Sequence, residues 1–385
     1  AGPAWWPACC STACGTGWAD RHCASPGLAV DWNDRYTASG RPPAVIPLVD
    51  TLPLENDWQR QLRDAVDSPE LLLQLLSLTP EQMGSSAAAA RQFPVKVPAA
   101  FLQRMQPGNP KDPLLLQVLA TAEELRDAPG YTRDPVGETG DANPCSGIIQ
   151  KYRSRVLLIA SSACAIHCRY CFRRHFPYED NRNSRRGWQQ SLRQIATDTE
   201  ITEVILSGGD PLTITDSHLS TLVDLVAAIP QVRRLRIHTR LPVVIPDRVT
   251  EALLTALDHQ GLQVIVVIHA NHPNEIDGAV SGALHRLRER GITLLNQSVL
   301  LAGINDDVDA LAALSERLFE AGVLPYYLHL LDKVQGAAHF DTAEERAGDL
   351  IAQLSARLPG YLVPRLVREV AGAGSKVPVT APLAF

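Results

Sequence analysis

The sequence predicts an α/β protein built on a parallel sheet, and two observations support that prediction. First, six apolar runs rich in β-branched residues alternate with amphipathic segments; the runs are Val156–Ala160, Val204–Leu206, Leu235–His238, Val264–His269, Thr293–Leu300 and Tyr326–Leu331. Second, polar residues recur where these runs end, which is where parallel barrels place their reactive groups. Because alternating strands and helices form right-handed βαβ units, we expect a six-stranded, incompletely closed α/β barrel. A doubly wound open sheet is the alternative.

The segments between the runs have the spacing of amphipathic helices. Between the second and third runs the apolar positions are Leu219, Leu222, Val223 and Val226, and Pro230 ends the segment. Between the third and fourth runs they are Val249, Leu253, Leu254 and Leu257. Asp247 precedes this second set and is the predicted N-cap. A further strand is predicted at 363–370.

The chain divides into three parts by composition. Residues 1–45 form an irregular extension, which we expect to be poorly ordered and whose four cysteines we give no role. Residues 46–144 form a helical cap and a linker, with helical patterns from Trp58 to Leu125 and a Pro/Gly-rich stretch from 127 to 144. Residues 145–385 form the barrel and a C-terminal segment that carries Lys376.

Composition excludes several functional classes. The 385 residues are 45% hydrophobic and 20% charged, which is typical of a globular protein with a substantial core. The formal net charge of -6 argues against nucleic acid as the main partner. No apolar run approaches the roughly 18 residues that span a bilayer, and no secretory signal is recognisable. We therefore expect a cytoplasmic protein with no membrane partner.

Cys164, Cys168 and Cys171 directly follow the first predicted strand. Three thiolates on one short loop can hold a metal centre and leave one coordination position open, which suits catalysis. The alternatives are a structural zinc site or three buried small residues. A closed zinc site needs four ligands, usually in paired C-x2-C spacing, and no second pair follows here.

Polar residues and glycines also follow the other predicted strands. Ser207, Gly208, Gly209 and Asp210 follow the second strand, His238 and Arg240 the third, His269 the fourth and Asp332 the sixth, while Gln297 lies within the fifth. Adjacent glycines let the backbone approach a ligand closely, since neither has a Cβ. Each residue alone is more typical of a turn, a cap or the surface. Their recurrence at one end of successive strands favours a binding site.

Four motifs in combination resemble the radical S-adenosylmethionine (SAM) lysine 2,3-aminomutases. They are C-x3-C-x2-C-F-R-R from Cys164, S-G-G-D-P-L from Ser207, N-Q-S-V-L-L from Asn296 and G-x-G-S-K-x-P from Gly372. The resemblance runs from about Pro94 to Pro378. Within the family it is closest to the EpmB-type branch, which makes β-lysine for elongation factor P; the F-P-V-K-V-P segment from Phe93 and C-R-Y-C-F-R-R-H-F from Cys168 are shared with that branch.

The resemblance implies a partial (β/α)6 radical SAM barrel with three cofactors: a [4Fe-4S] cluster, SAM and pyridoxal 5'-phosphate (PLP). Cys164, Cys168 and Cys171 would ligate the cluster, and Lys376 would form the Schiff base with PLP. Arg173 would bind the substrate carboxylate, whereas Asp332 and Glu369 would hold the far ammonium of lysine. The family usually has Asp in place of Glu369.

The remaining implied contacts are to the cofactors. Ser207, Gly208, Gly209 and Asp210 would contact SAM, Arg155 and Tyr152 would lie near PLP, and His269 and Gln297 would lie near SAM or PLP. The pair of acids also has a physical rationale, because an ammonium removed from water needs a fixed countercharge.

The implied function is an isomerase that converts L-lysine to (R)-β-lysine, which a lysyl ligase attaches to elongation factor P. A reductant would supply the electron for the cluster. Two alternatives stay open: a catabolic lysine 2,3-aminomutase that makes (S)-β-lysine, and a non-catalytic metal-binding barrel. Both enantiomers are compatible with the same residues in a rotated substrate pose. The catabolic branch also binds zinc through additional C-terminal cysteines, whereas no cysteine follows Cys171 in this sequence.

Overall fold

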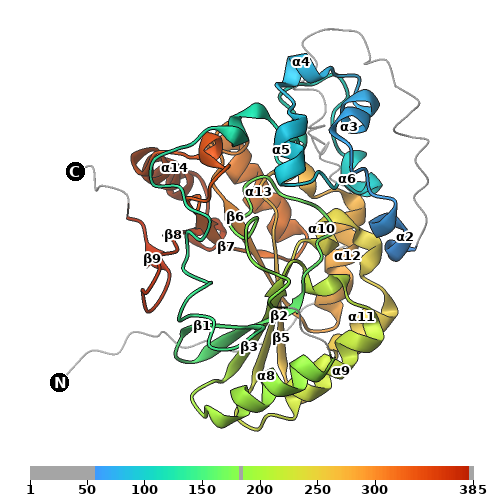
Figure 1. The fold of residues 1–385 in the computed structure, drawn as a ribbon, viewed down its shortest axis with the longest axis vertical. Helices are drawn as coiled ribbons and strands as arrows, with labels where there is room; N and C mark the ends of the chain where they lie inside the picture. Colours follow the sequence, from blue (N-terminus) through green and yellow to red (C-terminus); the bar gives the residue numbers. More distant parts are fainter. Residues whose placement is uncertain (1–56, 182–184, 381–385) are drawn as a thin grey trace, which may run out of the picture. The chain divides into compact units, whose positions relative to one another are not determined.

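The computed structural model describes residues 57–181 and 185–380, so the predicted extension at 1–45 lies outside the described residues. The described chain contains a nine-stranded sheet (Figure 1). Its strands are β1 (Ile148–Tyr152), β2 (Arg155–Ser161), β3 (Glu203–Gly208), β4 (Arg234–Thr239), β5 (Gln263–Ile268), β6 (Thr293–Val299), β7 (Leu324–His329), β8 (Arg365–Arg368) and β9 (Val377–Pro378).

The strands lie in the sheet in the order in which they occur in the chain. From β2 to β8 every neighbouring pair is parallel, whereas β1 and β9 are antiparallel to their neighbours. Right-handed crossovers that always advance in one direction place their helices on one side of the sheet. A doubly wound sheet instead requires a point where the order reverses. The predicted α/β class with parallel strands is therefore confirmed, and the doubly wound alternative is wrong.

Helices connect the parallel strands and lie on their outer side (Figure 1). The longer ones are α8 (Arg185–Thr197), α9 (Asp216–Ala227), α11 (Glu251–Leu257), α12 (Gly278–Glu289), α13 (Val308–Glu320) and α14 (Glu344–Arg357). The predicted N-cap Asp247 is wrong for α11, because Pro246–Arg248 forms a separate 3-10 turn, η4. The cap is Thr250, whose side chain accepts from the Leu253 amide. Within the described ranges, no helix is both long and apolar enough to cross a membrane.

Short helices precede the sheet in the region where helical patterns were expected. They are α2 (Trp58–Arg63), α3 (Pro69–Leu75), α4 (Pro80–Met83), α5 (Ala87–Gln92), α6 (Ala99–Leu102), α7 (Pro113–Leu116) and the 3-10 turn η2 (Ala122–Leu125). Three of them begin with proline, which is favourable in the first turn because its missing N–H has no helical acceptor there. Buried side chains of these helices belong to the same apolar core as the strands.

Two differences from the expected strands affect the site. β1 was not predicted, although it forms a hairpin with β2 and contributes Lys151 and Tyr152. β7 begins and ends two residues before the predicted run, so Asp332 lies on the loop beyond its end. The predicted strand at 363–370 is shorter, since β8 covers Arg365–Arg368.

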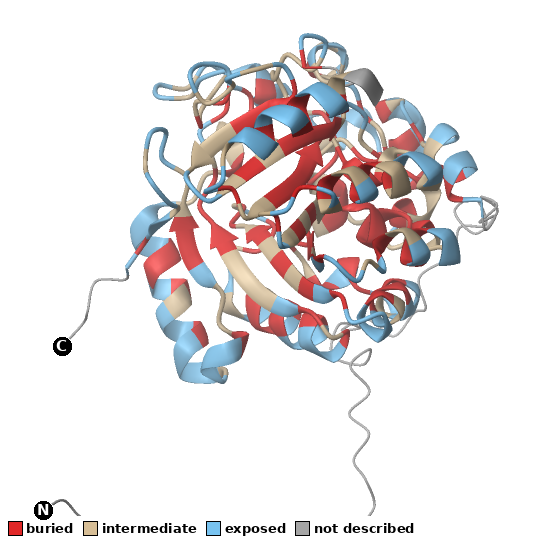
Figure 2. Cartoon of the chain, turned by 90° about the horizontal axis from the view of Figure 1, so that it is seen from below, coloured by how far each residue is buried: buried red, intermediate tan, exposed pale blue. Residues whose placement is uncertain are grey.

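The two faces of the sheet differ in polarity. Along β4, Leu235, Ile237 and Thr239 are buried, whereas the alternating Arg236 and His238 are only partly buried. Figure 2 shows that the strands are largely buried and that the outer surfaces of the helices are exposed. Since successive side chains point to opposite faces of a strand, the apolar face packs under the helices. The other face carries polar side chains and forms the floor of the site.

Candidate active site

The three cysteines lie on the loop that follows β2, and all three are free thiols. Burial raises the pKa of the Cys164 thiol, and the neighbouring thiols of Cys171 and Cys168 raise it further. Two cations lie against this loop. Lys96 Nζ donates to the Cys164 carbonyl oxygen at 3.0 Å, and Arg240 Nη1 donates to Cys168 Sγ at 2.7 Å. A desolvated group of thiols flanked by cations suits an anionic, thiolate-ligated cluster.

The geometry does not favour a single zinc ion. Thiolates on one zinc lie about 2.3 Å from it, and hence about 4 Å from one another. No three His, Cys, Asp or Glu side chains in the described part of the chain are arranged to hold one metal ion. An iron–sulfur cubane attaches its cysteines to different irons, so its ligands stand farther apart. Cluster ligation by the three cysteines therefore stays a prediction from the sequence.

Gly208 and Gly209 fit closely against the cysteine loop. A Cβ on Gly208, which has φ +121°, would lie 2.3 Å from the Ser161 carbonyl oxygen, and a Cβ on Gly209 would lie 2.4 Å from the Ala163 carbonyl oxygen. The Gly209 amide donates to the Ser161 oxygen at 2.8 Å. The close approach expected of these glycines is therefore made to the cysteine loop, and their predicted contact with SAM stays a prediction.

We expect Gly209→Ala to lower the free energy of unfolding by about 1–3 kcal/mol, the usual cost of overpacking. It should also reduce the iron bound per chain, because the loop carrying Cys164 must move. Chemical denaturation and iron analysis measure the two effects. Gly278→Ala is the matched control, since a Cβ there meets no atom within 4 Å. Equal stability of both variants would contradict this assignment.

Asp210 is buried, and its hydrogen bonds connect the loop after β3 to the end of β4. Its carboxylate accepts from the Leu212 amide at 3.0 Å, from Thr239 Oγ1 at 2.7 Å and from the Arg240 amide at 2.7 Å. These bonds fix the loop after β3 to the end of β4. The carboxylate thus has in-chain partners, and its predicted role at SAM stays a prediction.

Lys376 lies beside Glu369, as the sequence analysis expected of two residues in one site. Lys376 Nζ is 2.9 Å from Glu369 Oε2, and its side chain is 24% exposed. Tyr152 Oη donates to Glu369 Oε1 at 2.8 Å, and the Arg155 guanidinium stacks on the Tyr152 ring at 4.3 Å. Burial would raise the pKa of the Glu369 carboxyl, but the charges of Lys376 and Lys151 outweigh burial and hold that pKa at about 2.

A row of ion pairs joins Lys376 to the cysteine loop. Lys151 Nζ is 3.2 Å from Glu369 Oε1 and 3.2 Å from Glu138 Oε1. Glu138 in turn accepts from Arg173 Nε at 2.6 Å and from Arg173 Nη2 at 2.9 Å, while Arg173 Nη1 donates to Ser207 Oγ at 2.8 Å. Arg173 follows Cys171 by two residues, so the amine and the thiols belong to one connected site.

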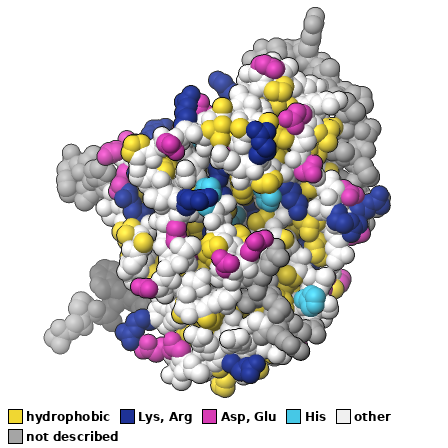
Figure 3. Space-filling view, viewed as in Figure 1, with side chains coloured by type: hydrophobic (Ala, Val, Ile, Leu, Met, Phe, Trp, Pro, Cys, Tyr) yellow, Lys and Arg dark blue, Asp and Glu magenta, His cyan; other side chains and the backbone are white. Residues whose placement is uncertain are grey.

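Histidines and Asp332 complete this polar face. Burial, followed by the charges of Arg240, Arg173 and Lys376, lowers the pKa of His269 to about 3, so this imidazole is neutral. Its Nε2 lies 3.0 Å from Gln297 Nε2, and its ring centroid is 6.0 Å from that of His238. Burial raises the pKa of Asp332 to about 7, against the opposing charge of Lys376. Figure 3 shows histidine, basic and acidic side chains near the centre of one face.

Three further residues of this polar region were not predicted from the sequence: Glu138, Lys151 and His329. Glu138 lies in the Pro/Gly-rich stretch that was predicted to be a linker, and nothing in its local pattern signals burial. Lys151 lies on the unpredicted strand β1. His329 is the last residue of β7, and burial lowers its pKa well below the usual value. Its place at a strand end is the signal that could have identified it.

The fold and the site together define an iron–sulfur enzyme of the α/β class, and comparisons with known proteins agree. Residues 153–238 match the family model described as a 4Fe-4S single cluster domain. The chain is 48% identical over 328 residues to the L-lysine 2,3-aminomutase of Escherichia coli strain K12, which covers 85% of this chain and 95% of that protein. It is 47% identical over 332 residues to the Haemophilus influenzae protein of the same name, covering 86% and 98%.

A more distant relative is the L-lysine 2,3-aminomutase of Clostridium subterminale, 34% identical over 325 residues, or 84% of this chain and 78% of that protein. At these identities and coverages the chain belongs to the L-lysine 2,3-aminomutase family. It is accordingly an isomerase, and the family uses a [4Fe-4S] cluster, SAM and PLP.

Proposed function

We propose that this enzyme converts L-lysine to β-lysine, with the cluster on Cys164, Cys168 and Cys171 and PLP attached to Lys376. The observation that carries the proposal is a pair of internal contacts. Arg173 holds the carboxylate of Glu138, and Glu369 holds the ammonium of Lys376. Free lysine brings the same two groups, a carboxylate and a side-chain ammonium.

Each internal partner satisfies a charge that would be costly to bury alone. The Arg173 fork is complementary to a planar carboxylate, and bidentate pairing fixes its orientation. Glu369, with Asp332 nearby, presents acids to the other end of the substrate. A glutamate substrate would instead bring a second carboxylate toward these acids, so the charge pattern favours lysine.

The residues near Lys376 fit PLP. The Lys376 amine lies 5.7 Å from the centroid of the Tyr327 ring, and Tyr152, which donates to Glu369, carries the Arg155 guanidinium on its ring. When bound, the cluster and SAM supply an organic radical, and PLP supplies a conjugated system over which the unpaired electron spreads. The chain itself orients the substrate through Arg173, Glu369 and Asp332. Burial of these groups limits the access of water to the reacting carbons.

We further propose the (R) product and a role in modifying elongation factor P through a partner ligase, with a cellular reductant and in the cytoplasm. Support comes from the F-P-V-K-V-P segment that the chain shares with that branch. Phe93 stacks on His167 with ring centroids 5.3 Å apart, and Lys96 contacts the Cys164 backbone. The segment therefore packs against the cysteine loop.

The test is an anaerobic assay of reconstituted protein with SAM, PLP, dithionite and either L-lysine or L-glutamate. We expect β-lysine from lysine and no turnover of glutamate. Chiral chromatography separates the two branches: (R)-β-lysine supports the elongation factor P role, and (S)-β-lysine supports the catabolic one. Turnover of another amino acid, with none of lysine, would overturn the substrate assignment.

Asp332 makes activity dependent on pH. Because its pKa is raised to about 7, the carboxyl is neutral below that pH and cannot compensate a substrate ammonium. We expect kcat/KM for lysine to fall about tenfold per pH unit below pH 7, since this parameter reports ionisations of the free enzyme. Asp332→Asn should lower kcat/KM and flatten this limb. Asp309→Asn, at an exposed position of α13, should keep this limb. An unchanged limb in Asp332→Asn would assign it to another group.

A further inference from the structure

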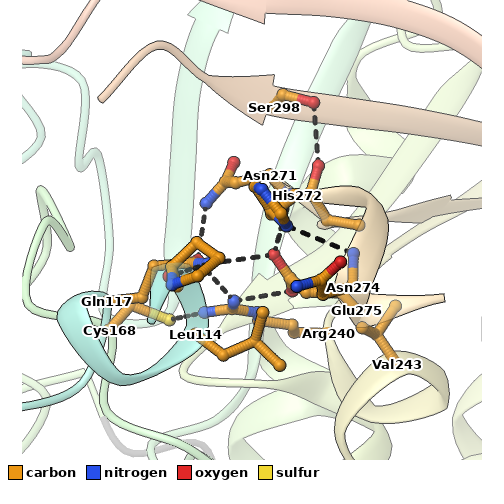
Figure 4. Close-up of polar contacts among 12 residues, drawn as sticks. Leu114, Gln117, Cys168, Arg240, Val243, Asn271, His272, Asn274, Glu275 and Ser298 are labelled. Atoms are coloured by element: carbon orange, nitrogen blue, oxygen red, sulfur yellow. Dashed lines mark hydrogen bonds and ion pairs between the residues drawn. The ribbon is translucent and has the colours of Figure 1, made fainter. Parts of the chain in front are cut away.

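Arg240 is the centre of a buried polar cluster beneath the cysteine loop (Figure 4). It directly follows β4 and precedes the short helix α10 (Leu241–Val244). Its Nη1 donates to Cys168 Sγ at 2.7 Å, and its Nη2 donates to Gln117 Oε1 at 2.7 Å and to Glu275 Oε2 at 2.8 Å. The Arg240 side chain is 6% exposed and that of Glu275 is 0% exposed. The contact with sulfur is therefore made away from bulk water.

The acceptors that hold Arg240 come from separate parts of the chain. Gln117 ends α7, and Glu275 lies in η5 (Pro273–Glu275) after β5. Asn271 connects these two acceptors. Its backbone N–H donates to Glu275 Oε1 at 2.8 Å, and its side-chain Nδ2 donates to Gln117 Oε1 at 3.0 Å. The Phe101 ring lies 5.3 Å from the Arg240 guanidinium. With acceptors and a ring around it, the guanidinium has one orientation, and that orientation directs Nη1 at Cys168.

The three thiols differ in the hydrogen bonds that their sulfur atoms accept from cationic side chains. Within the part of the chain that the structure describes, only Cys168 accepts a hydrogen bond at sulfur from a cationic side chain. Lys96, the cation near Cys164, instead donates to the backbone oxygen. Hydrogen bonds and charges at ligand sulfurs set the reduction potential of iron–sulfur clusters, and residues behind the ligands orient them.

We propose that Arg240 is a positioning residue that fixes Cys168 and raises the reduction potential of the cluster, with Glu275 setting how far. Reduction adds one negative charge to the cluster. A guanidinium against a ligand sulfur stabilises that charge, and the low dielectric of a buried site strengthens the effect. Glu275 carries the opposite charge and offsets part of it. The inference rests on the proposed ligation of the cluster by Cys164, Cys168 and Cys171.

The test is an EPR-monitored redox titration of the full chain, reconstituted anaerobically without SAM. Arg240→Gln should lower the equilibrium constant for one-electron reduction by about tenfold, which is about 59 mV. Glu275→Gln should shift the potential in the opposite direction, because the guanidinium loses its countercharge. A purely structural role predicts no such reversal of sign.

Arg248→Gln is the matched control. Arg248 is also fully buried, but it donates to the Leu212 carbonyl oxygen at 2.7 Å and stacks on Trp58. Its replacement should leave the potential unchanged. If Arg240→Gln does not fold, two other variants replace it. Arg240→Lys keeps the charge but lacks the second guanidinium arm, so its contact with Cys168 shifts. Glu275→Gln removes the countercharge of Arg240 and leaves the cysteine loop unaltered.

Two outcomes would overturn the inference: an unchanged potential in a fully loaded Arg240 variant, or shifts of the same sign in the Arg240 and Glu275 variants. Iron and sulfide analysis of the unaltered protein is the separate readout for the proposed function. If the unaltered protein binds no cluster, the ligation proposal fails. If it binds a cluster whose reduction potential is the same in the Arg240 variant, only the present inference fails.

Discussion

Replacing Lys376 by alanine is expected to abolish PLP attachment and to reduce β-lysine formation below detection. An amine forms a covalent link to PLP only from a position where the chain presents it, and Glu369 holds the Lys376 amine at 2.9 Å, at the end of the row of ion pairs that reaches the cysteine loop. Borohydride reduction of the PLP-loaded protein, followed by peptide mass mapping, should find the cofactor on the peptide that contains Lys376. The visible absorbance of bound PLP should disappear in the variant.

Lys151 is the competing amine, because its Nζ lies 3.2 Å from the same Glu369 carboxylate. It is also 3.2 Å from Glu138 Oε1, so two carboxylates hold the Lys151 amine in place. Lys333→Ala is the control, since Lys333 is exposed on the loop beyond Asp332. PLP found on Lys151, or retained by the Lys376 variant, would overturn the assignment of Lys376.

Strand positions were predictable because a buried parallel strand is a short apolar run bounded by polar residues. The fourth run, Val264–His269, differs from β5 by one residue at each end. The predicted run Tyr326–Leu331 ends two residues after β7. The reason is that Leu330 and Leu331 are buried beyond the end of the strand, where they join other apolar clusters. Apolar burial therefore continues past the hydrogen-bonded ladder, and a pattern of hydrophobicity alone cannot locate the strand end.

The same distinction applies to the site. His269 and Asp332 were identifiable from their positions at or beyond strand ends, because topology brings those ends together. Glu138 was not, since its function depends on a contact with Arg173 across 35 positions of sequence. Asp210 shows the converse limit: the motif located a buried acid, yet its bonds are to the chain. Motifs thus locate polar residues, and only the fold assigns their partners.

Glu369→Gln should lower kcat/KM for lysine by about 10²- to 4 × 10³-fold. Leaving one member of a buried ion pair without its partner costs about 3–5 kcal/mol, and each 1.4 kcal/mol is about tenfold. The Glu369 side chain is 10% exposed, and its carboxylate holds both Lys376 and Lys151. The loss should appear mainly in KM, because the acid binds an end of the substrate that does not react.

Glu369→Asp separates charge from shape. This variant keeps a carboxylate at position 369 and introduces Asp, the residue that the family usually has there. It should therefore recover most of the kcat/KM that the Gln variant loses. PLP loading must be measured in both variants, because Glu369 also positions Lys376. If the Gln variant loads PLP fully and keeps the KM of the unaltered enzyme, Glu369 serves only to hold Lys376, and the substrate ammonium must be bound by Asp332 without it.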